Sequence, residues 1–334
     1  MVQLSLTDLP TLSEIEDAEV KIRKYFPPTP LEYSKSISGI LGRETYLKLE
    51  TALPVRVFKI RGALNKFMSL PEAELESGVV TASSGNHGLA VAYVSRLFGV
   101  DATVCVPTNA NPQKVAAIEE QGGKIIRFGN SYDMAYERAV AISKAEDLKF
   151  LHAFDDRQVI AGQGTCGLEI SRQLPLAEAV AVAIGGGGLI SGISIAIKES
   201  LPGTRVYGAE TYSIPSMYES IQRGERTRVV PRPTIADGMQ SAIPGGLTFE
   251  AVRKNVDKIG LVDDGQLEDA IFDLLSLARV LAEPAGASPL AAMKGPLREE
   301  PGNKIVLVIS GGNISIDLLT SILTKRAKGS SGNP

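Results

Sequence analysis

The sequence contains no tryptophan and only two cysteines, Cys105 and Cys166. Two isolated cysteines exclude a disulfide framework and a cysteine-based metal cluster, so both are expected to be buried small hydrophobic residues. The chain also lacks any apolar run near the ~20 residues that a membrane-spanning helix needs. Its acidic start, residues 1–19, has no apolar signal core. We therefore expect a cytoplasmic protein that does not contact a membrane.

The chain also has no excess of positively charged residues. Lys and Arg number 35 against 38 Asp and Glu, which gives a formal net charge of −3, and no basic stretch is interleaved with aromatic residues. Nucleic-acid binding is therefore disfavoured. With 44% apolar residues, 22% charged residues and 33 glycines, the composition is typical of an α/β enzyme. A chain of 334 residues exceeds the usual single core and predicts two lobes.

Short β-rich segments alternate along the chain with stretches of helical length, which predicts βαβ units and mainly parallel sheets. Near-continuous apolar runs such as residues 180–184 and 305–309 are typical of strands covered by helices on both faces. The expected strands are residues 78–81, 102–106, 124–128, 179–184, 204–209 and 304–310. The expected helices are residues 86–98, 112–121, 131–145, 188–200 and 265–281. The strands fall into two groups, which predicts a large lobe (1–52 and 150–325), an inserted small lobe (53–149) and a flexible tail (326–334).

Four consecutive glycines, Gly185 to Gly188, stand between an expected strand and an expected helix. Backbone N–H groups in such a turn, with the positive end of the helix, form a phosphate cradle. A tight turn alone would not need four glycines. A dinucleotide site is the competing interpretation, because Glu210 follows the next expected strand, where an acid would bind the ribose. The G-x-G-x-x-G pattern of such sites does not fit, because Leu189 stands where it needs a glycine. A smaller phosphate-bearing cofactor or substrate is therefore indicated.

Lys59 lies at the junction of a proline-containing loop and a helical run, in the segment Val57–Ala63. A lysine is usually a solvated surface residue. A lysine that forms a Schiff base must be partly desolvated, so that its amine is neutral often enough to attack a carbonyl. Phe58 and Ile60 would supply apolar surroundings, and the residues alone leave both interpretations open.

The segment Thr81–Gly88 crowds serine, asparagine, histidine and glycine where a strand ends and a helix begins. Free N–H groups and hydroxyls at a helix N-terminus suit a carboxylate. Helix capping by Ser83 or Ser84 is the alternative, and it explains one serine but not the whole group. His87 serves either proton transfer or the structure of this loop.

Two further polar residues stand beside glycine. Ser310 ends a buried strand, at the edge where open α/β sheets place ligands. It would bond a ring nitrogen of a ligand, or else cap the helix that follows Asn313. Glu283, which precedes Pro284, is either a loop residue or part of a pocket wall.

In this order, these segments resemble the serine and threonine dehydratase and serine racemase family of pyridoxal-phosphate enzymes, which have the tryptophan synthase β-subunit fold (fold type II). The resemblance runs from Thr29 to Leu319. It implies an α/β fold of two open, mainly parallel sheets flanked by helices, with a small lobe inserted in a large one. The segments that carry it are Phe58–Ala63, Ser83–Gly88, Gly185–Gly188, Glu283–Ala287 and Ser310–Asn313.

The resemblance also implies a role for each matching residue. Lys59 would be the Schiff-base lysine and the catalytic base, and Ser84 would be a second acid/base. The residues expected to contact the cofactor are Phe58, Lys59, Asn86, Gly185, Gly186, Gly187, Gly188, Leu189, Glu283 and Ser310. The residues expected to bind the substrate are Ser83, Ser84, Asn86 and His87.

The activity implied is a pyridoxal-phosphate-dependent ammonia-lyase that converts L-threonine or L-serine to 2-oxobutanoate or pyruvate and ammonia by α,β-elimination. A homodimer is expected, as in the family and in most small oligomers. Ser84 keeps amino acid racemisation open as an alternative. Arg56 replaces a glycine of the relatives near the lysine. It either points to solvent or enters the pocket as a substrate-binding residue, which would favour 3-hydroxyaspartate, and phenylserine is a further alternative substrate.

A divalent cation is a further expectation from the resemblance. Relatives hold it with an acid like Glu210, a backbone carbonyl near Ile214 and an aspartate where Ser216 stands in this chain. Mg²⁺ and Ca²⁺ favour charged oxygen ligands, so the missing carboxylate predicts a weakened site.

Overall fold

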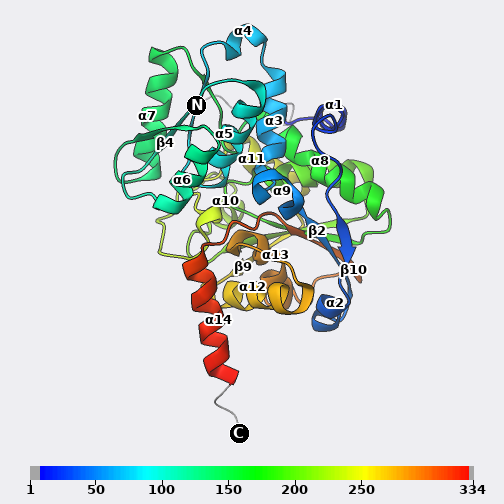
Figure 1. Ribbon diagram of the computed structural model, residues 1–334. Helices are drawn as coiled ribbons and strands as arrows, with labels where there is room; N and C mark the ends of the chain where they lie inside the picture. The colour runs from blue at the N-terminus through cyan, green and yellow to red at the C-terminus, as the bar shows by residue number, and fades with distance from the viewer. Residues whose placement is uncertain (1–7, 331–334) are drawn as a thin grey trace.

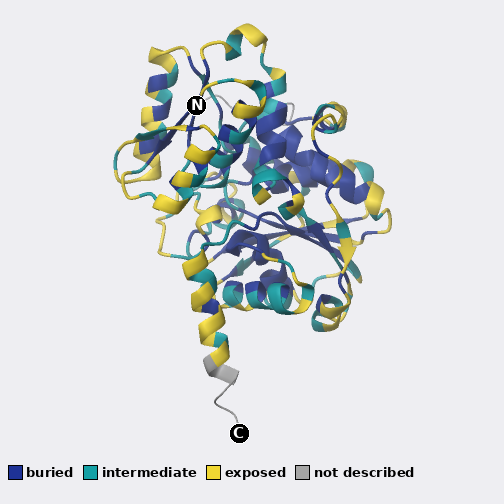
Figure 2. Ribbon diagram, viewed as in Figure 1, coloured by how far each residue is buried: buried dark blue, intermediate teal, exposed yellow. Residues whose placement is uncertain are grey.

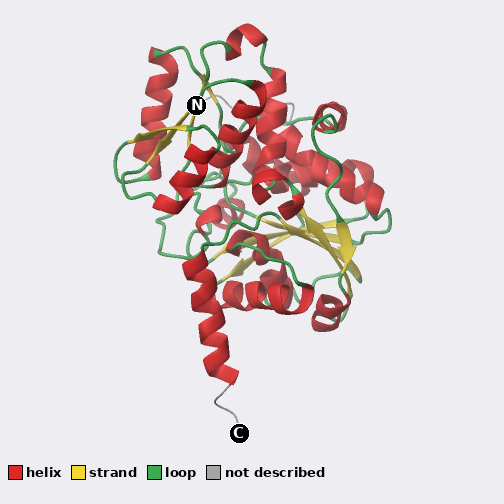
Figure 3. Ribbon diagram, in the orientation of Figure 1, coloured by secondary structure: helices red, strands yellow, loops and turns green. Residues whose placement is uncertain are grey.

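The computed structural model describes residues 8–330 and consists of two sheets, each with helices on both faces (Figures 1 and 3). The larger sheet has six strands in the order β1-β2-β10-β7-β8-β9, and the smaller has four in the order β5-β4-β3-β6. All neighbouring strands pair in parallel except β1 and β2. The expected fold class is therefore confirmed.

The elements have the following bounds. The strands of the larger sheet are β1 Leu31–Tyr33, β2 Glu44–Leu49, β7 Ala179–Ala183, β8 Arg205–Thr211, β9 Lys258–Val262 and β10 Lys304–Ile309. Those of the smaller sheet are β3 Val79–Ala82, β4 Ala102–Val106, β5 Lys124–Arg127 and β6 Lys149–Phe150. The α-helices are α1 Leu12–Ile22, α2 Lys35–Leu41, α3 Lys59–Ser69, α4 Glu72–Leu75, α5 Asn86–Phe98, α6 Pro112–Glu120, α7 Tyr132–Ala145, α8 Arg157–Gln173, α9 Gly188–Ser200, α10 Ser216–Arg223, α11 Gly246–Asn255, α12 Asp264–Ala278, α13 Pro284–Lys294 and α14 Ile316–Ser330. Short 3₁₀ turns are η2 Glu50–Ala52, η3 Pro54–Arg56 and η4 Asp237–Met239.

The central strands of the larger sheet are buried on both faces (Figure 2). Successive side chains of a strand point to opposite faces. In β10, Ile305 and Leu307 therefore pack into the core that includes α12 and α13, whereas Val306 and Val308 pack into the core that includes α8 and α9. Burying such a side chain is worth roughly 1.5–3 kcal/mol. The apolar runs in the sequence thus mark the centre of this sheet.

The smaller sheet is covered in the same way. Helix α7 packs against β3 and β4 from one side, and α5 and α6 pack against β4 and β5 from the other. Cys105 lies buried on β4 and Cys166 lies buried on α8, both as free thiols, as expected.

All the expected helices and strands are present, with bounds that differ by at most a few residues. The sequence patterns did not reveal β1, β2, β6 or β9. The expected boundary between the lobes at residue 150 needs correction, because Phe150 pairs with Val80 in the smaller sheet.

The first part of the expected flexible tail (326–334) is helical, and its flexibility stays a prediction. Helix α14 continues to Ser330 and projects from the body of the molecule (Figure 1). Its last turns contain lysine, arginine and alanine, which favour the helix. Residues 331–334 and the first seven residues of the acidic start lie outside the described part of the chain.

Within residues 8–330, no helix combines the length and the apolar character required to cross a bilayer.

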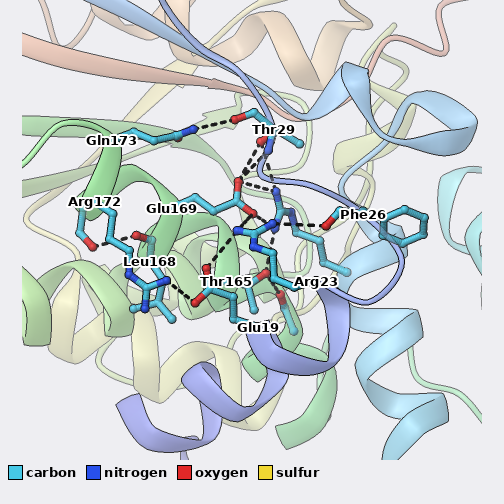
Figure 4. A network of polar contacts seen from close by, with 12 residues as sticks. Glu19, Arg23, Phe26, Thr29, Thr165, Leu168, Glu169, Arg172 and Gln173 are labelled. Carbon is cyan, nitrogen blue, oxygen red and sulfur yellow. Dashed lines mark hydrogen bonds and ion pairs between the residues drawn. The ribbon is translucent and has the colours of Figure 1, made fainter.

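A buried network of charged residues fixes the start of α3, and Figure 4 shows the part of it around Thr29 and Glu169. The Arg61 guanidinium lies 2.6 Å from the carboxylate of Glu50 and 2.6 Å from that of Glu169. Lys48 on β2 also reaches Glu169, at 2.6 Å, and Thr29 Oγ1 donates to Glu50 at 2.7 Å. The two cations hold the pKa of the Glu169 carboxyl well below its usual range, although burial opposes them. The network joins α3 to η2, β2 and α8.

We expect Arg61→Ala to destabilise the protein by about 3–5 kcal/mol, because two carboxylates would be left buried without this cation. Arg253→Ala is the matched control, since Arg253 makes its ion pair with Glu250 on an exposed face of α11 and such pairs contribute at most about 1 kcal/mol. Thermal unfolding of both variants with saturating cofactor measures the difference. Equal midpoints for the two variants would show that the buried network does not stabilise the fold.

Candidate active site

The candidate site lies where the segment after β3 meets the segment after β10, since Asn313 Nδ2 donates to Asn86 Oδ1. In open α/β sheets, ligands bind at the carboxyl ends of the strands. The segment before α3 is joined to the loop after β10 by three contacts. Phe58 N–H donates to Ser310 O at 3.0 Å, Gly312 N–H donates to Arg56 O at 3.0 Å, and Val57 forms an isolated bridge with Gly311.

Lys59 is the first residue of α3 and is only partly accessible. Its Nζ donates a hydrogen bond of 2.7 Å to the carbonyl oxygen of Ala153 and lies 5.2 Å from the centroid of the Phe58 ring. Burial lowers the pKa of the Lys59 amine to about 8, although the nearby Glu283 carboxylate opposes this shift. A substantial fraction of the amine is therefore neutral near physiological pH, as an attacking amine requires.

Asn86 and Glu283 meet in the site from segments 197 residues apart. Asn86 Nδ2 donates to Glu283 Oε1 at 2.7 Å, and Asn313 Nδ2 donates to Asn86 Oδ1 at 2.8 Å. Glu283 precedes the first turn of α13 and is 4% exposed, and burial raises the pKa of its carboxyl. Glu283 is thus a wall residue of the site and not a solvated loop residue.

The backbone amides at the N-terminus of α5 have no side-chain cap among residues 8–330. Gly85 is its N-cap, and no side chain of the described residues caps the helix. Ser83 Oγ accepts a hydrogen bond from Gly85 N at 3.2 Å within the loop, and Ser84 is partly buried beside it. The alternative that a serine caps α5 is therefore wrong. The amides of the first turn are left to bind an anion such as a carboxylate.

His87 follows this loop and is buried. Its Nε2 lies 3.1 Å from the carbonyl oxygen of Leu151, so this nitrogen carries the proton. Burial, and then the charge of Lys59, lower the pKa of the imidazole to about 3. The ring is therefore neutral at physiological pH, and its hydrogen bond ties the loop to the segment that follows β6.

The four glycines form an open turn at the start of α9. Gly187 is the N-cap with a φ of +92°, a conformation that favours glycine, and no side chain of the described residues caps this helix. A Cβ at Gly186 would lie 2.3 Å from the ring of Phe154. A cradle without side chains at the positive end of a helix fits a phosphate group, so the residues present fit pyridoxal phosphate.

Ser310 follows β10 and is 1% exposed. The alternative that Ser310 caps the next helix is wrong, because α14 begins at Ile316 and Ser315 Oγ accepts the hydrogen bond from Leu318 N.

Arg56 is exposed and has a φ of +53°. Its carbonyl oxygen accepts the hydrogen bond from Gly312 N in the loop after β10. A role of the Arg56 side chain in substrate binding stays a prediction.

The expected metal ligands are used in other ways. Both carboxylate oxygens of Glu210 accept backbone N–H bonds from the first turn of α10, at 2.9 and 2.8 Å. Burial raises the pKa of this carboxyl to about 8. Ser216 Oγ donates to Ser241 O at 2.6 Å, and the carbonyl of Ile214 accepts from Ser216 N at 2.9 Å. Residues 8–330 contain no cluster of three His, Cys, Asp or Glu side chains suited to a metal. Binding of Mg²⁺ or Ca²⁺ here stays a prediction.

Sequence reasoning missed several residues that support the site. Ala153 and Thr248 were missed because an alanine and a threonine carry no local signal of function. Lys114 on α6 was missed because it lies in an ordinary helix. It forms an ion pair with Asp237, beside Glu283, and burial lowers the pKa of its amine.

Known proteins resemble this chain in sequence and in fold. Residues 22–311 match the family described as pyridoxal-phosphate dependent enzyme. The chain is 44% identical to an L-threonine ammonia-lyase from Thermotoga maritima, over 94% of this chain and 78% of the relative. It is 34% identical to the catabolic L-threonine dehydratase TdcB from Staphylococcus aureus, over 96% of this chain and 94% of the relative. The structure of maize serine racemase superposes with a TM-score of 0.88 at 32% identity, covering 96% of this chain and 99% of that one.

The lowered pKa of Lys59 predicts how the reaction of the cofactor-free chain with pyridoxal phosphate depends on pH. The neutral amine becomes the major form as pH rises through about 8, so the rate of appearance of the visible absorbance band should level off there. An ordinary lysine would gain reactivity up to about pH 10.4. Rates normalised to those of N-acetyl-lysine amide correct for titration of the cofactor itself. Between about pH 8 and pH 10.4, the rate divided by that of N-acetyl-lysine amide should fall steadily. A quotient that stays constant over these pH values would contradict the prediction.

Proposed function

The chain belongs to the pyridoxal-phosphate dependent enzyme family, and from this we propose that it is an L-threonine ammonia-lyase that forms 2-oxobutanoate and ammonia. L-serine, which would give pyruvate, is the second substrate of the same chemistry. The observation that supports the proposal is the partly desolvated amine of Lys59, whose acceptor Ala153 directly precedes Phe154 beside the glycine cradle. Within the described part of the chain, the cradle and the start of α5 both lack a side-chain cap.

When bound, pyridoxal phosphate supplies an aldehyde that condenses with amines and an electron sink that makes the α-hydrogen of an amino acid acidic. The residues that would hold it are the four glycines and Leu189 at its phosphate, and Phe58, Asn86 and Glu283 around its ring. Ser310 would meet its ring nitrogen. A hydroxyl group there, unlike a carboxylate, does not favour protonation of that nitrogen.

The substrate is held at the start of α5. Its carboxylate accepts hydrogen bonds from the free amides of the first turn and from the hydroxyls of Ser83 and Ser84, where the positive end of the helix stabilises the charge. Asn86 and His87 complete this wall. This orientation presents the α-hydrogen to the amine of Lys59.

Lys59 moves the proton. Its neutral amine takes the proton from the α-carbon, a step favoured because the pKa of about 8 lies near the working pH. The C–O bond at the β-carbon then breaks, and the β-hydroxyl leaves as water with the proton that Lys59 took from the α-carbon. The resulting enamine takes up water outside the elimination step and releases ammonia, which yields 2-oxobutanoate from threonine.

The enzyme is further proposed to work as a homodimer, since twofold assemblies predominate among soluble oligomers.

Purified protein incubated with L-threonine should release 2-oxobutanoate and ammonia in equal amounts. Lys59→Ala should lower this rate by at least about 10³-fold, because both the anchoring amine and the base are lost. A coupled assay for the keto acid measures both. Release of keto acid by Lys59→Ala at the wild-type rate would exclude Lys59 as the base.

The racemase alternative is separated by product chirality. If elimination dominates, the L-threonine or L-serine that remains after partial turnover keeps its configuration. Chiral chromatography of the remaining substrate, with wild type and Ser84→Ala, measures this. Accumulation of D-serine faster than pyruvate, lost in Ser84→Ala, would identify the enzyme as a racemase instead.

The role of Arg56 is tested with a panel of L-threonine, L-serine, 3-hydroxyaspartate and phenylserine. Because Arg56 is exposed, Arg56→Gly should leave kcat/KM for threonine within about twofold of wild type. A wild-type preference for hydroxyaspartate that disappears in Arg56→Gly would reassign the substrate to a dicarboxylic amino acid.

A further inference from the structure

Four consecutive residues, His152 to Asp155, connect the lysine to the phosphate cradle. The carbonyl oxygen of Ala153 accepts the hydrogen bond from Lys59 Nζ at 2.7 Å. The next residue, Phe154, places its ring so close to the cradle that a Cβ at Gly186 would lie 2.3 Å from it. The segment leads from β6 of the smaller sheet into α8, whose residues Cys166 and Ile170 share a core with β7 and β10 of the larger sheet.

Asp155 caps a helix that begins 91 residues later in the chain. Its Oδ2 accepts from Gly246 N at 2.8 Å, and its Oδ1 accepts from Leu247 N at 2.8 Å, both in the first turn of α11. Gly245, the N-cap of α11, offers no side chain of its own, and a Cβ there would lie 2.3 Å from Asp155 Cγ. The carboxylate therefore satisfies the free amides and the positive end of α11.

Helix α11 in turn holds the cradle. Thr248, in its first turn, is fully buried and donates from Oγ1 to Gly186 O at 2.7 Å. The C=O and N–H groups of a trans peptide point in opposite directions. The bond from Thr248 therefore turns the N–H of Gly187 away from α11, so that this amide is available to an anion.

These contacts form one connected path from the amine to the cradle. It runs from Lys59 through Ala153 and Asp155 to Thr248 and Gly186. A rigid cofactor has a fixed separation between its aldehyde and its phosphate. A site binds such a ligand tightly only if its two anchoring points are held at the matching separation before binding.

We propose that Asp155 is a positioning residue that holds the phosphate cradle in register with Lys59, and thereby sets the affinity for pyridoxal phosphate. The inference rests on the proposed function, because it takes its ligand from the cofactor assigned there. Asp155 has no proposed contact with the reacting atoms or the phosphate, and it acts through α11 and Thr248.

Asp155→Ala is tested against Asp156→Ala as the matched control. Asp156 is the neighbouring carboxylate and also caps a helix, accepting from Gln158 N at 2.8 Å and Val159 N at 3.1 Å at the start of α8. Holoenzyme is dialysed against graded pyridoxal phosphate, and the bound fraction is read from the visible absorbance. Asp155→Ala should raise the Kd by about tenfold or more, because charge-assisted hydrogen bonds are lost, while Asp156→Ala should change it by less than about threefold.

A purely structural role predicts a different pattern. In that case both alanine variants would lower the thermal midpoint alike at every cofactor concentration, with the Kd unchanged, and this result would overturn the proposal. The proposal instead predicts that the rise of the midpoint with cofactor concentration is displaced to higher concentration only in Asp155→Ala.

Thr248→Val keeps the side-chain shape and removes only the hydroxyl that holds Gly186. It should raise the Kd for pyridoxal phosphate, as Asp155→Ala does. If Asp155→Ala does not fold, the Kd of Thr248→Val tests the proposal by itself. A wild-type Kd in Thr248→Val would overturn the proposal.

The test is independent of turnover, since the Kd is measured without substrate. Tight binding of the cofactor by wild type without release of keto acid from threonine would count against the proposed function, while a weakened Asp155→Ala would still support this inference. Threonine turnover by wild type together with unchanged Kd values in Asp155→Ala and Thr248→Val would overturn this inference alone.

Discussion

The structure of the site depends on one hydrogen bond in a poorly hydrated place, from the amine of Lys59 to the carbonyl of Ala153. A carbonyl is a neutral acceptor and does not stabilise the ammonium form as a carboxylate in contact would. Burial can therefore lower the pKa of the amine, and Glu283 opposes the shift without cancelling it. The same bond fixes where the nucleophile points, because Ala153 lies in the segment that supports the phosphate cradle.

Three sets of long-range contacts keep that geometry. The buried ion pairs of Arg61 with Glu50 and Glu169 hold the first turn of α3 against the larger sheet. Asn86 joins the smaller lobe to Glu283 at the start of α13. Asp155 joins the segment after β6 to α11. Each set links segments that lie far apart in the sequence. Arg61, Glu50, Glu169 and Glu283 are buried as a result, and Asn86 and Asp155 are partly buried. Buried polar groups of this kind are tolerated only when they are bonded, and these are.

Much of this architecture could be predicted from the sequence, because apolar runs mark strands buried on both faces and glycine-rich turns mark their carboxyl ends. Strand β2 was missed because it carries Lys48, which reads as a surface residue but is buried beside Glu169. Strand β9 was missed because Gly260 interrupts it where Leu297 packs closely. Contacts of Lys59, Asn86 and Glu283 agree with a shared site, and the roles of the motif residues stay predictions. Ala153, Thr248 and Lys114 were not found. Their importance comes from what lies beside them in space, which spacing along the chain does not reveal.

Lys59 is the residue proposed to bind the cofactor covalently. Reduction of the holoenzyme with borohydride, followed by proteolysis and mass spectrometry, identifies the lysine that carries the pyridoxyl group. The label is expected on the peptide that contains Lys59, in stoichiometric amount. A label on Lys114, the other lysine beside Glu283 whose pKa is lowered by burial, or on any other lysine, would contradict this assignment.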